Sequence, residues 1–384
     1  MKKLLLLALL SQLAACNLLD ENKNTAGPSV SNLTEDSADI RVAKFSPEGD
    51  IWLSVNDNSN PVISIFKQQN GEWQKQETDI ATTHPVTEIA FVRGRSDLND
   101  GALLTLTAAD YGSSDLAFLS SDLSDLQSNL QPKAYSDIKY QLGNERVYQI
   151  GRFDLDYIAS VSYDDLIATV SYQYSVNDDG LTGANPYTVI EKANNNAYLI
   201  RYGSTSIWQI NPQASAEEDF KLAEIDLSDF ADADGTPEMA DAVLVGDVLY
   251  VILQRLEYYD AIHKGLLIAI DTTDNSIIDL DNTAEGTNGL ELLVTNPENI
   301  QYVNNKLLIN AVGRYAAWDG SRDAEYTGGV ETINPQTLDQ TLIFANNAST
   351  GQTSSCSVYG DKMLLNQYFS YGSNKVTLVE NINI

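Results

Sequence analysis

The sequence predicts an all-β protein, a β-propeller of about seven blades, and three observations lead to this fold class. Short runs of Val, Ile, Leu, Tyr and Thr alternate with Gly, Asn and Asp, which is the chemistry of strands and turns. Similar units recur roughly every 50 residues, a spacing within the range of propeller repeats. Continuous helical periodicity is scarce along the chain. Six or eight blades stay open because unit boundaries between residues 100 and 180 are blurred, and a pair of β-sandwiches is the competing architecture.

The clearest repeat unit begins at Asn185 and reads "NPYTVIEKANNNAYLIRYGSTSIWQINPQ". Its order is proline, strand, polar turn, apolar strand, Gly-Ser turn, and a strand closed by Asn-Pro. The same order recurs from Pro85, Pro237 and Pro297, and three further stretches fit without the proline. Three visible strands and a weaker fourth would form each blade, and closure of the ring protects the strand edges. The predicted units start near residues 38, 85, 136, 186, 237, 297 and 354.

The N-terminus has the parts of a secretory signal. Lys2 and Lys3 supply a positive end, and the apolar run from Leu4 to Leu10 is too short to span a bilayer. Small residues then lead to Cys16. An ordinary signal peptide with an incidental cysteine is one interpretation of this segment.

The tetrapeptide Leu13-Ala14-Ala15-Cys16 resembles the lipobox of bacterial lipoproteins. The resemblance implies cleavage before Cys16, a diacylglycerol on its thiol, and a further acyl chain such as palmitate on the new amino terminus. Several acyl chains anchor a protein stably in a lipid bilayer. We therefore expect a signal peptide over 1–15, a lipidated cysteine and flexible tether over 16–36, and a propeller domain over 37–384.

The net charge of the chain and the residue that follows Cys16 are both consistent with export to the cell envelope. The formal net charge of −31 becomes −33 when the two lysines of the signal peptide are removed. So acidic a surface excludes nucleic acid and electrostatic docking on anionic lipid as partners. Asn17 stands where Asp would be an inner-membrane retention signal, which favours the outer membrane. Cys356 is left without a disulfide partner, so we expect a buried thiol in a monomeric protein.

A second resemblance covers roughly Gly151 to Pro335. The strings that carry it are "GRFDLDYIASVSYDD", "YSVNDDGLTGANPYTVI", "AYLIRYGSTSIWQINP", "DLSDFADADGTPEMADAVLVGDVLYVILQRL" and "GRYAAWDGSRDAEYTGGVETINP". They are similar to exported proteobacterial lipoproteins with YVTN-type propeller blades. The resemblance implies the fold and the export, and it carries over no catalytic residues.

Catalytic signatures are nearly absent from the sequence. The two histidines, His84 and His263, lie in different units, whereas metal cages and triads usually need more imidazole. The G-x-S-x-G elbow, the P-loop and the H-E-x-x-H motif do not occur. We therefore expect no required cofactor, and binding rather than catalysis.

An acidic loop gives a weak calcium hypothesis. Asp232, Asp234 and Glu238 place three carboxylates beside a Gly turn, and hard oxygen ligands of this kind suit Ca²⁺. The EF-hand pattern fails because Phe230 stands at the first ligand position. Solvated turns with Asx hydrogen bonds are the alternative in a chain this acidic.

Alignment of the units suggests a ligand site at the mouth of the central channel. The end of each second strand, on the same face as the start of each inner strand, carries arginines and aromatic residues, and two glutamates follow blade-starting prolines nearby. This predicted ring comprises Arg152, Arg201, Tyr202, Arg255, Arg314, Tyr315, Tyr368, Glu238 and Glu298. Guanidinium forks bind carboxylate, phosphate or catecholate, and aromatic faces stack on ligands. Ion pairs that merely join neighbouring blades are the structural alternative.

The sequence therefore predicts a lipid-anchored envelope propeller that acts as a ligand-binding module or a protein-interaction scaffold. Its partners would be the bilayer, through acylated Cys16, and either a small anionic ligand or another envelope protein. The alternative from another class is a propeller lyase or hydrolase that works with tyrosines, arginines and carboxylates, for example Tyr202 or Tyr315 beside Glu238.

Overall fold

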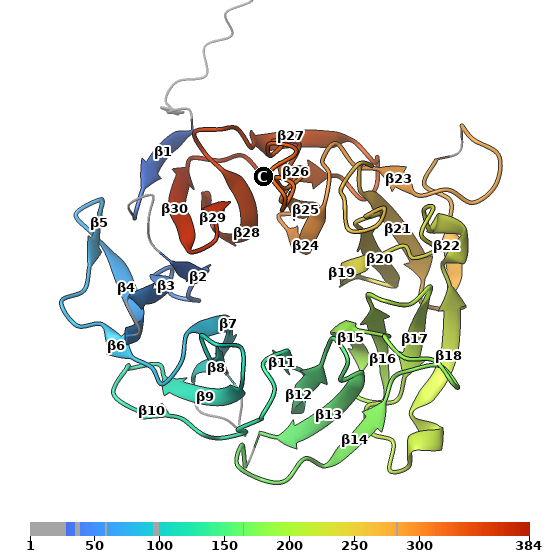
Figure 1. The fold of residues 1–384 in the computed structure, drawn as a ribbon, viewed down its shortest axis with the longest axis horizontal. Coiled ribbons are helices and arrows are strands. Elements are labelled where there is room, and N and C mark those ends of the chain that lie inside the picture. The colour runs from blue at the N-terminus through green and yellow to red at the C-terminus, as the bar shows by residue number, and fades with distance from the viewer. Residues whose placement is uncertain (1–27, 35–38, 58–59, 95–99, 164, 282) are drawn as a thin grey trace, which may run out of the picture.

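Seven antiparallel sheets stand around a central channel and form a β-propeller (Figure 1). The computed structural model describes residues 28–34, 39–57, 60–94, 100–163, 165–281 and 283–384. The expected signal peptide, Cys16 and most of the expected tether lie outside these residues. The all-β fold class and the seven-blade count are confirmed. The seven inner strands begin within two residues of the predicted unit starts.

Each blade has its innermost strand first in the chain. The first blade comprises β2 (Ile40–Phe45), β3 (Ile51–Asp57), β4 (Asn60–Gln69) and β5 (Glu72–Lys75), with a short β6 (Ile80–Ala81). The second comprises β7 (Val86–Val92), β8 (Gly101–Thr107), β9 (Ser114–Ser120) and β10 (Leu126–Gln127). The third comprises β11 (Ile138–Leu142), β12 (Arg146–Gly151), β13 (Tyr157–Ser162) and β14 (Tyr172–Ser175).

The next three blades continue the same order. The fourth comprises β15 (Pro186–Ala193), β16 (Asn196–Arg201), β17 (Ser206–Ile210) and β18 (Lys221–Asp226). The fifth comprises β19 (Met239–Val245), β20 (Val248–Leu253), β21 (Leu266–Asp271) and β22 (Ser276–Ile278), with a short β23 (Leu290–Glu291). The sixth comprises β24 (Pro297–Val303), β25 (Lys306–Ala311), β26 (Gly329–Ile333) and β27 (Gln340–Ala345). Two 3₁₀ turns, Glu217–Asp219 and Ser228–Phe230, are the helical segments of the described chain, and none of its helices is long and apolar enough to cross a membrane.

The seventh blade joins the two ends of the chain. It consists of β28 (Gln352–Tyr359), β29 (Lys362–Ser370), β30 (Ser373–Glu380) and, outermost, β1 (Ser29–Asn32). β1 lies within the range expected for the tether, yet it pairs with β30 through four residue pairs. The N-terminal strand therefore closes the ring by covering the edge of the last blade.

The hydrophobic core lies between neighbouring blades. In β16, Leu199 packs with Ile150 of the preceding blade, whereas Ile200 packs with Val251 of the following blade. Successive side chains of a strand point to opposite faces, so a sheet sandwiched between two others is apolar on both. This explains the uninterrupted apolar run in "AYLI" and similar second strands.

Candidate ligand site at the channel mouth

A repeated backbone irregularity builds the channel mouth. In six of the seven inner strands the register slips after the first or second residue, so that one residue has no partner in the neighbouring strand. Such a bulge re-aims the extra side chain. The six bulged residues are Arg41, Thr87, Tyr187, Ala240, Glu298 and Ser354, and all of them line one cavity of about 530 Å³ in the channel.

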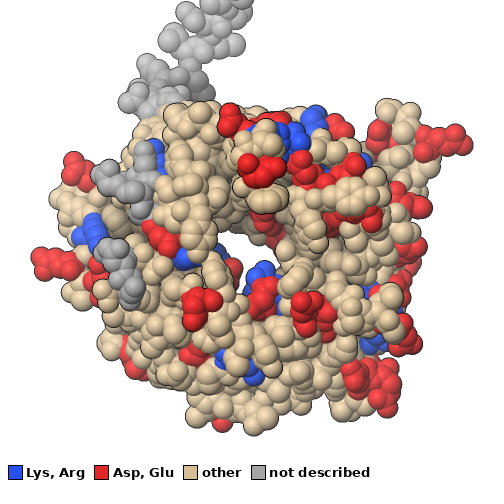
Figure 2. Space-filling view, in the orientation of Figure 1, with Lys and Arg blue, Asp and Glu red and all other residues tan. Residues whose placement is uncertain are grey.

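The blade that lacks the bulge contributes cations to the same cavity. β11 supplies Lys139, and Arg152 follows β12 by one residue. Together with Arg41 and Lys44 they make four basic side chains in the lining, against the three carboxyl groups of Glu88, Asp241 and Glu298. Figure 2 shows Lys and Arg side chains at the rim of the central opening, on a face where Asp and Glu prevail.

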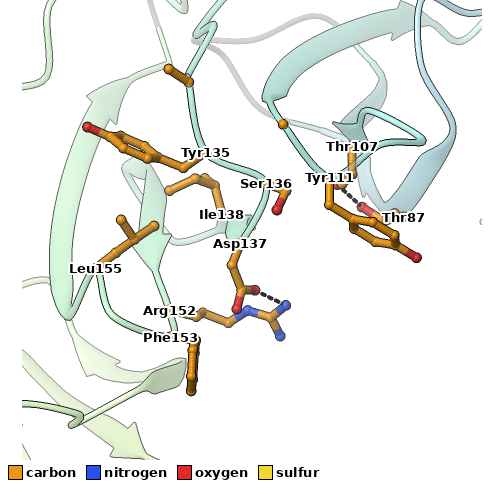
Figure 3. A pocket seen from close by; sticks show the side chains of 12 residues that line it. Thr87, Thr107, Tyr111, Tyr135, Ser136, Asp137, Ile138, Arg152, Phe153 and Leu155 are labelled. Carbon is orange, nitrogen blue, oxygen red and sulfur yellow. Dashed lines mark hydrogen bonds and ion pairs between the residues drawn. The ribbon is translucent and has the colours of Figure 1, made fainter.

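The four cations differ in how they are paired. Arg41 forms a salt bridge with Asp39 at 3.0 Å, and Lys44 contacts Glu88 at 2.5 Å. Arg152 pairs with Asp137, also shown in Figure 3.

Lys139 is the exception. Its Nζ donates to the Tyr187 carbonyl oxygen at 3.3 Å, and among the described residues no carboxylate lies within salt-bridge distance of it. This ammonium group is therefore the lining cation available to an anion.

Aromatic and acidic groups also stand at the channel mouth. The rings of Tyr187 and Tyr202 stack with centroids 4.5 Å apart, and the Arg152 guanidinium lies 5.4 Å from the Tyr187 centroid. Tyr202 Oη donates to Gln254 Oε1 at 2.8 Å. Gln254 in turn hydrogen-bonds Glu298. Loss of hydration raises the pKa of Glu298 to about 7, although the hydrogen bond with Gln254 and the charge of Arg152 act in the opposite direction.

Asp241 is the second carboxyl group of the channel with a raised pKa. Loss of hydration raises that pKa, although Lys139 opposes the shift. The Asp241 carboxylate accepts hydrogen bonds from the Asn299 side chain and, at 3.2 Å, from the Ile300 backbone N–H. The raised pKa of Glu298 reduces the negative charge of the channel near neutral pH.

A second cavity of about 680 Å³ opens between the blades of β7 and β11, on the loops beside the channel mouth (Figure 3). Tyr111, Tyr135 and Phe153 stand around it, and Thr87 and Arg152 line both this cavity and the channel. We use the term aromatic cavity for this space.

The structure separates the four arginines that the sequence alignment placed together. Arg201 pairs with the first residue of its inner strand. In the other three blades the arginine lies beyond the residue that pairs with the first residue of the inner strand. Arg152 follows that paired residue by one position, Arg255 by two positions and Arg314 by three positions. A shift by one residue turns a strand side chain to the other face, so the four guanidinium groups do not form one ring.

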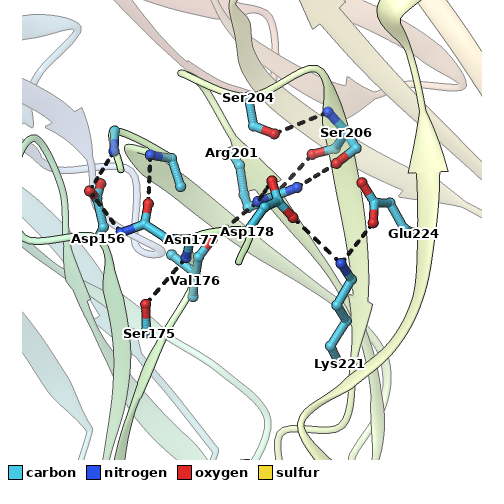
Figure 4. A network of polar contacts seen from close by, with 12 residues as sticks. Asp156, Ser175, Val176, Asn177, Asp178, Arg201, Ser204, Ser206, Lys221 and Glu224 are labelled. Carbon is cyan, nitrogen blue, oxygen red and sulfur yellow. Dashed lines mark hydrogen bonds and ion pairs between the residues drawn. The ribbon is translucent and has the colours of Figure 1, made fainter. Parts of the chain in front are cut away.

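Arg201 is wholly buried inside its blade. Its guanidinium donates to the Ser206 carbonyl oxygen at 3.2 Å and to Asp178 Oδ2 at 2.9 Å (Figure 4). It also lies 4.2 Å from the Trp208 ring centroid. Asp178 follows β14, so this contact joins two neighbouring blades. The geometry matches the structural alternative of ion pairs between blades.

Arg314 also bridges two blades, at the surface. Its guanidinium contacts both oxygens of Asp260, at 2.7 and 2.6 Å, and Glu325 at 2.6 Å. Arg255 has a positive φ of 56°, and its buried Nε has no hydrogen-bond partner within the described residues. Tyr315 and Tyr368 contact each other edge to face with centroids 5.4 Å apart.

Glu238 and Glu298 occupy different repeat positions. Glu238 precedes β19 in a left-handed conformation (φ 46°), as Asn185 and Asn296 do before their inner strands. Its carboxylate accepts hydrogen bonds from Thr236 Oγ1 at 2.7 Å and the Leu256 N–H at 3.0 Å. Burial raises the pKa of Glu238 to about 7.

The carboxylates proposed for Ca²⁺ accept hydrogen bonds from their own loop and from the loop of Tyr258, although Asp232 Oδ2 has no partner among the described residues. Asp232 accepts the Asp234 N–H at 3.1 Å, and Asp234 accepts the Thr236 hydroxyl at 2.8 Å and the Tyr258 N–H at 3.0 Å. Within the described ranges, no group of three His, Cys, Asp or Glu side chains is placed to hold a metal ion.

Sequence reasoning missed Arg41, Lys139, Tyr187 and Asp241. A usable signal exists for Tyr187, because Pro186-Tyr187 and Pro297-Glu298 are the same two positions of their units. No proline directly precedes Arg41, Lys139 or Asp241, and only the paired register places these three residues in the channel.

Comparison with known proteins supports the fold alone. No family model and no curated protein matches the sequence. A catalytically inactive variant of virginiamycin B lyase from Staphylococcus aureus, solved with quinupristin, superposes with a TM-score of 0.59 at 11% identity, covering 92% of this chain and 99% of that one. A streptogramin B lyase gives 0.57 at 14% identity, with 92% and 97% covered. A protein from Lactobacillus plantarum gives 0.54 at 11% identity, with 80% and 84% covered. At these identities the chain shares the propeller architecture with them.

Proposed function

We propose that this propeller is a binding module whose central channel captures a small anionic ligand. The observation that carries the proposal is Lys139, an ammonium group in a 530 Å³ cavity without a carboxylate partner among the described residues. The charge of Lys139 acts on Glu88 and Asp241 without forming an ion pair with either of them among the described residues. An incoming carboxylate or phosphate would form that ion pair, and Arg152 in the same lining would add a second donor.

The charge of the whole chain makes the cationic lining unusual. Lys and Arg number 23 against 54 Asp and Glu, yet the channel lining holds four basic residues and three carboxyl groups. The raised pKa of Glu298, about 7, shifts this balance further toward positive. A local reversal of sign concentrates anions against the general repulsion of an acidic surface.

A thermal-shift screen of the full chain tests the anion site. Carboxylates, phosphates, catecholate siderophores and Ca²⁺ are added in turn, because a ligand that binds the folded state raises the melting temperature. We expect an anion to stabilise the protein, and Lys139→Gln to abolish that shift. Lys306→Gln, at the start of β25, is the matched control and should keep it. An equal shift in both variants, or a shift with Ca²⁺ alone, would refute the anion site.

We also propose that the module is held at the cell envelope by lipid on Cys16. The lipobox-like tetrapeptide supports this proposal. Cys16→Ser should move the protein from the membrane fraction to the soluble fraction and abolish palmitate incorporation. A variant that still sediments with membranes would show that another feature holds it there.

A lyase or hydrolase is the second candidate, and Glu298 favours it. A carboxyl group with a pKa of about 7 can both donate and accept a proton near neutral pH. Glu298→Gln should then abolish turnover of a bound anion while its thermal shift remains. Unchanged conversion in that variant would exclude Glu298 as the acid or base.

A further inference from the structure

We infer that the ligand of the channel carries an aromatic ring next to its anionic group, and that this ring lies in the aromatic cavity. The inference rests on the anion site proposed above and adds the chemical class of its ligand. An aryl-alkyl carboxylate is the simplest molecule of this class.

The aromatic cavity presents three partly exposed rings. The side chains of Tyr111, Tyr135 and Phe153 are 51%, 53% and 63% exposed and border a space of about 680 Å³. Figure 3 shows Tyr135 and Phe153 on one side and Tyr111 on the other, with the Arg152–Asp137 pair between them. Aromatic rings that stack on a ligand ring gain stabilisation beyond the area they bury.

The backbone that carries two of the three rings is held in place before a ligand arrives. Tyr111 has a φ of 58°, a strained conformation for a bulky residue, and its Oη accepts a hydrogen bond from Arg41 at 3.2 Å. Such strain is tolerated where the surrounding structure imposes it, and it is frequent at ligand sites.

The turn that presents Phe153 is fixed in a similar way. It is closed by the Leu155 N–H, which donates to the Arg152 carbonyl at 2.7 Å, and it continues through Asp156 with a φ of 48°. The buried Asp156 carboxylate accepts the Gly183 and Asn185 N–H groups, each at 2.8 Å. A turn whose backbone is fixed in advance loses little conformational entropy on binding.

Arg152 connects the aromatic cavity to the anion site. Its guanidinium lines both spaces and lies 5.4 Å from the Tyr187 centroid on the channel side. Its buried Nε has no hydrogen-bond partner within the described residues. A ligand that spans the two spaces would place its anion near Lys139 and Arg152 and its ring against Phe153.

Isothermal titration of the full chain in non-ionic detergent, with three matched probes, tests the inference. Phenylpropionate has ring and charge, hexanoate has the charge with an aliphatic tail, and phenylpropanamide has the ring without charge. We expect phenylpropionate to bind about tenfold more tightly than hexanoate. The amide should bind more weakly than either acid.

The variants assign this preference to the cavity. Phe153→Ala should bring phenylpropionate down to the affinity of hexanoate. Trp318→Ala removes a ring that is 98% exposed on another loop, so it should leave the preference intact.

The outcomes separate the two proposals. Equal binding of both acids, lost in Lys139→Gln, would keep the anion site and overturn the aromatic class. An amide that binds as tightly as phenylpropionate, or a preference that survives Phe153→Ala, would also overturn it. Binding of neither acid would contradict both proposals.

Discussion

Two arginines with similar partners have very different environments. Arg201 has no exposed side-chain surface, whereas the Arg314 side chain is 22% exposed and its partner Asp260 is 38% exposed. A buried guanidinium that loses its partner, or leaves one behind, is strongly destabilising, whereas surface ion pairs contribute little. The matching sequence context of the two arginines hides this difference.

Replacement of each arginine by methionine measures how much each one contributes to the free energy of unfolding. Arg201→Met should lower the free energy of unfolding by about 3 kcal/mol, because Asp178 and the Ser206 carbonyl lose their donor. Arg314→Met should lower it by less than about 1 kcal/mol. Urea denaturation of both variants gives these values, and equal losses would contradict the assignment of Arg201 to the blade interior.

A buried glutamate away from the channel predicts a pH dependence. Glu331 in β26 is 0% exposed, and its Oε2 accepts the Leu293 N–H at 2.9 Å. Its Oε1 has no hydrogen-bond partner in the described part of the chain. Burial raises the pKa of Glu331 from 4.5 to about 7.

The direction in which stability changes with pH depends on whether the folded or the unfolded chain holds this proton. As pH rises from about 4.5 to 7, the unfolded chain loses this proton while the folded protein retains it, so stability falls with rising pH. Glu331→Gln removes this contribution. Its melting temperature should therefore fall less between about pH 5 and pH 8 than that of the wild type. Identical pH slopes for the two proteins would show that Glu331 is not the buried acid described above.

At the scale of elements, β1 has a larger role than its four residues indicate. All four side chains are exposed, so the strand adds pairing to β30 rather than apolar burial. Leu33, immediately after it, packs against the cluster that includes Leu364 and Leu378. An unpaired β30 would be a template for intermolecular pairing.

Truncation tests this closure. A chain that begins at residue 39 should melt several degrees lower than a chain that begins at residue 28, and it should scatter light increasingly with concentration. The chain that begins at residue 28 retains β1 and serves as the control. Equal melting temperatures and equal scattering would mean that β1 does not stabilise the ring.

The limits of prediction from the sequence are visible in these same elements. Inner strands such as β15 and β24 were predictable, because a proline marks each start and an apolar second strand follows a polar turn in each unit. β1 was not, because Ser29–Asn32 contacts solvent on every side chain and shows no hydrophobic period. The bulges were not predictable either, since an extra residue such as Arg41 leaves no trace in composition.

At the scale of the whole molecule, the propeller fold is compatible with many functions, and the residues that line the channel favour some of them over others. Propellers host many activities, so the chemistry of the site has to decide. Among the predicted site residues, Arg152 and Glu298 line the channel and Tyr202 stacks on Tyr187 beside them, whereas Arg201 lies inside a blade. We propose that this acidic protein holds an anion at Lys139.

Anomalous diffraction from crystals soaked in bromide tests that claim most directly, because it locates the anion without assuming its chemistry. We predict a bromide peak in the channel within contact distance of Lys139 Nζ, and its loss in Lys139→Gln crystals. Bromide peaks at surface lysines together with an empty channel would contradict the claim.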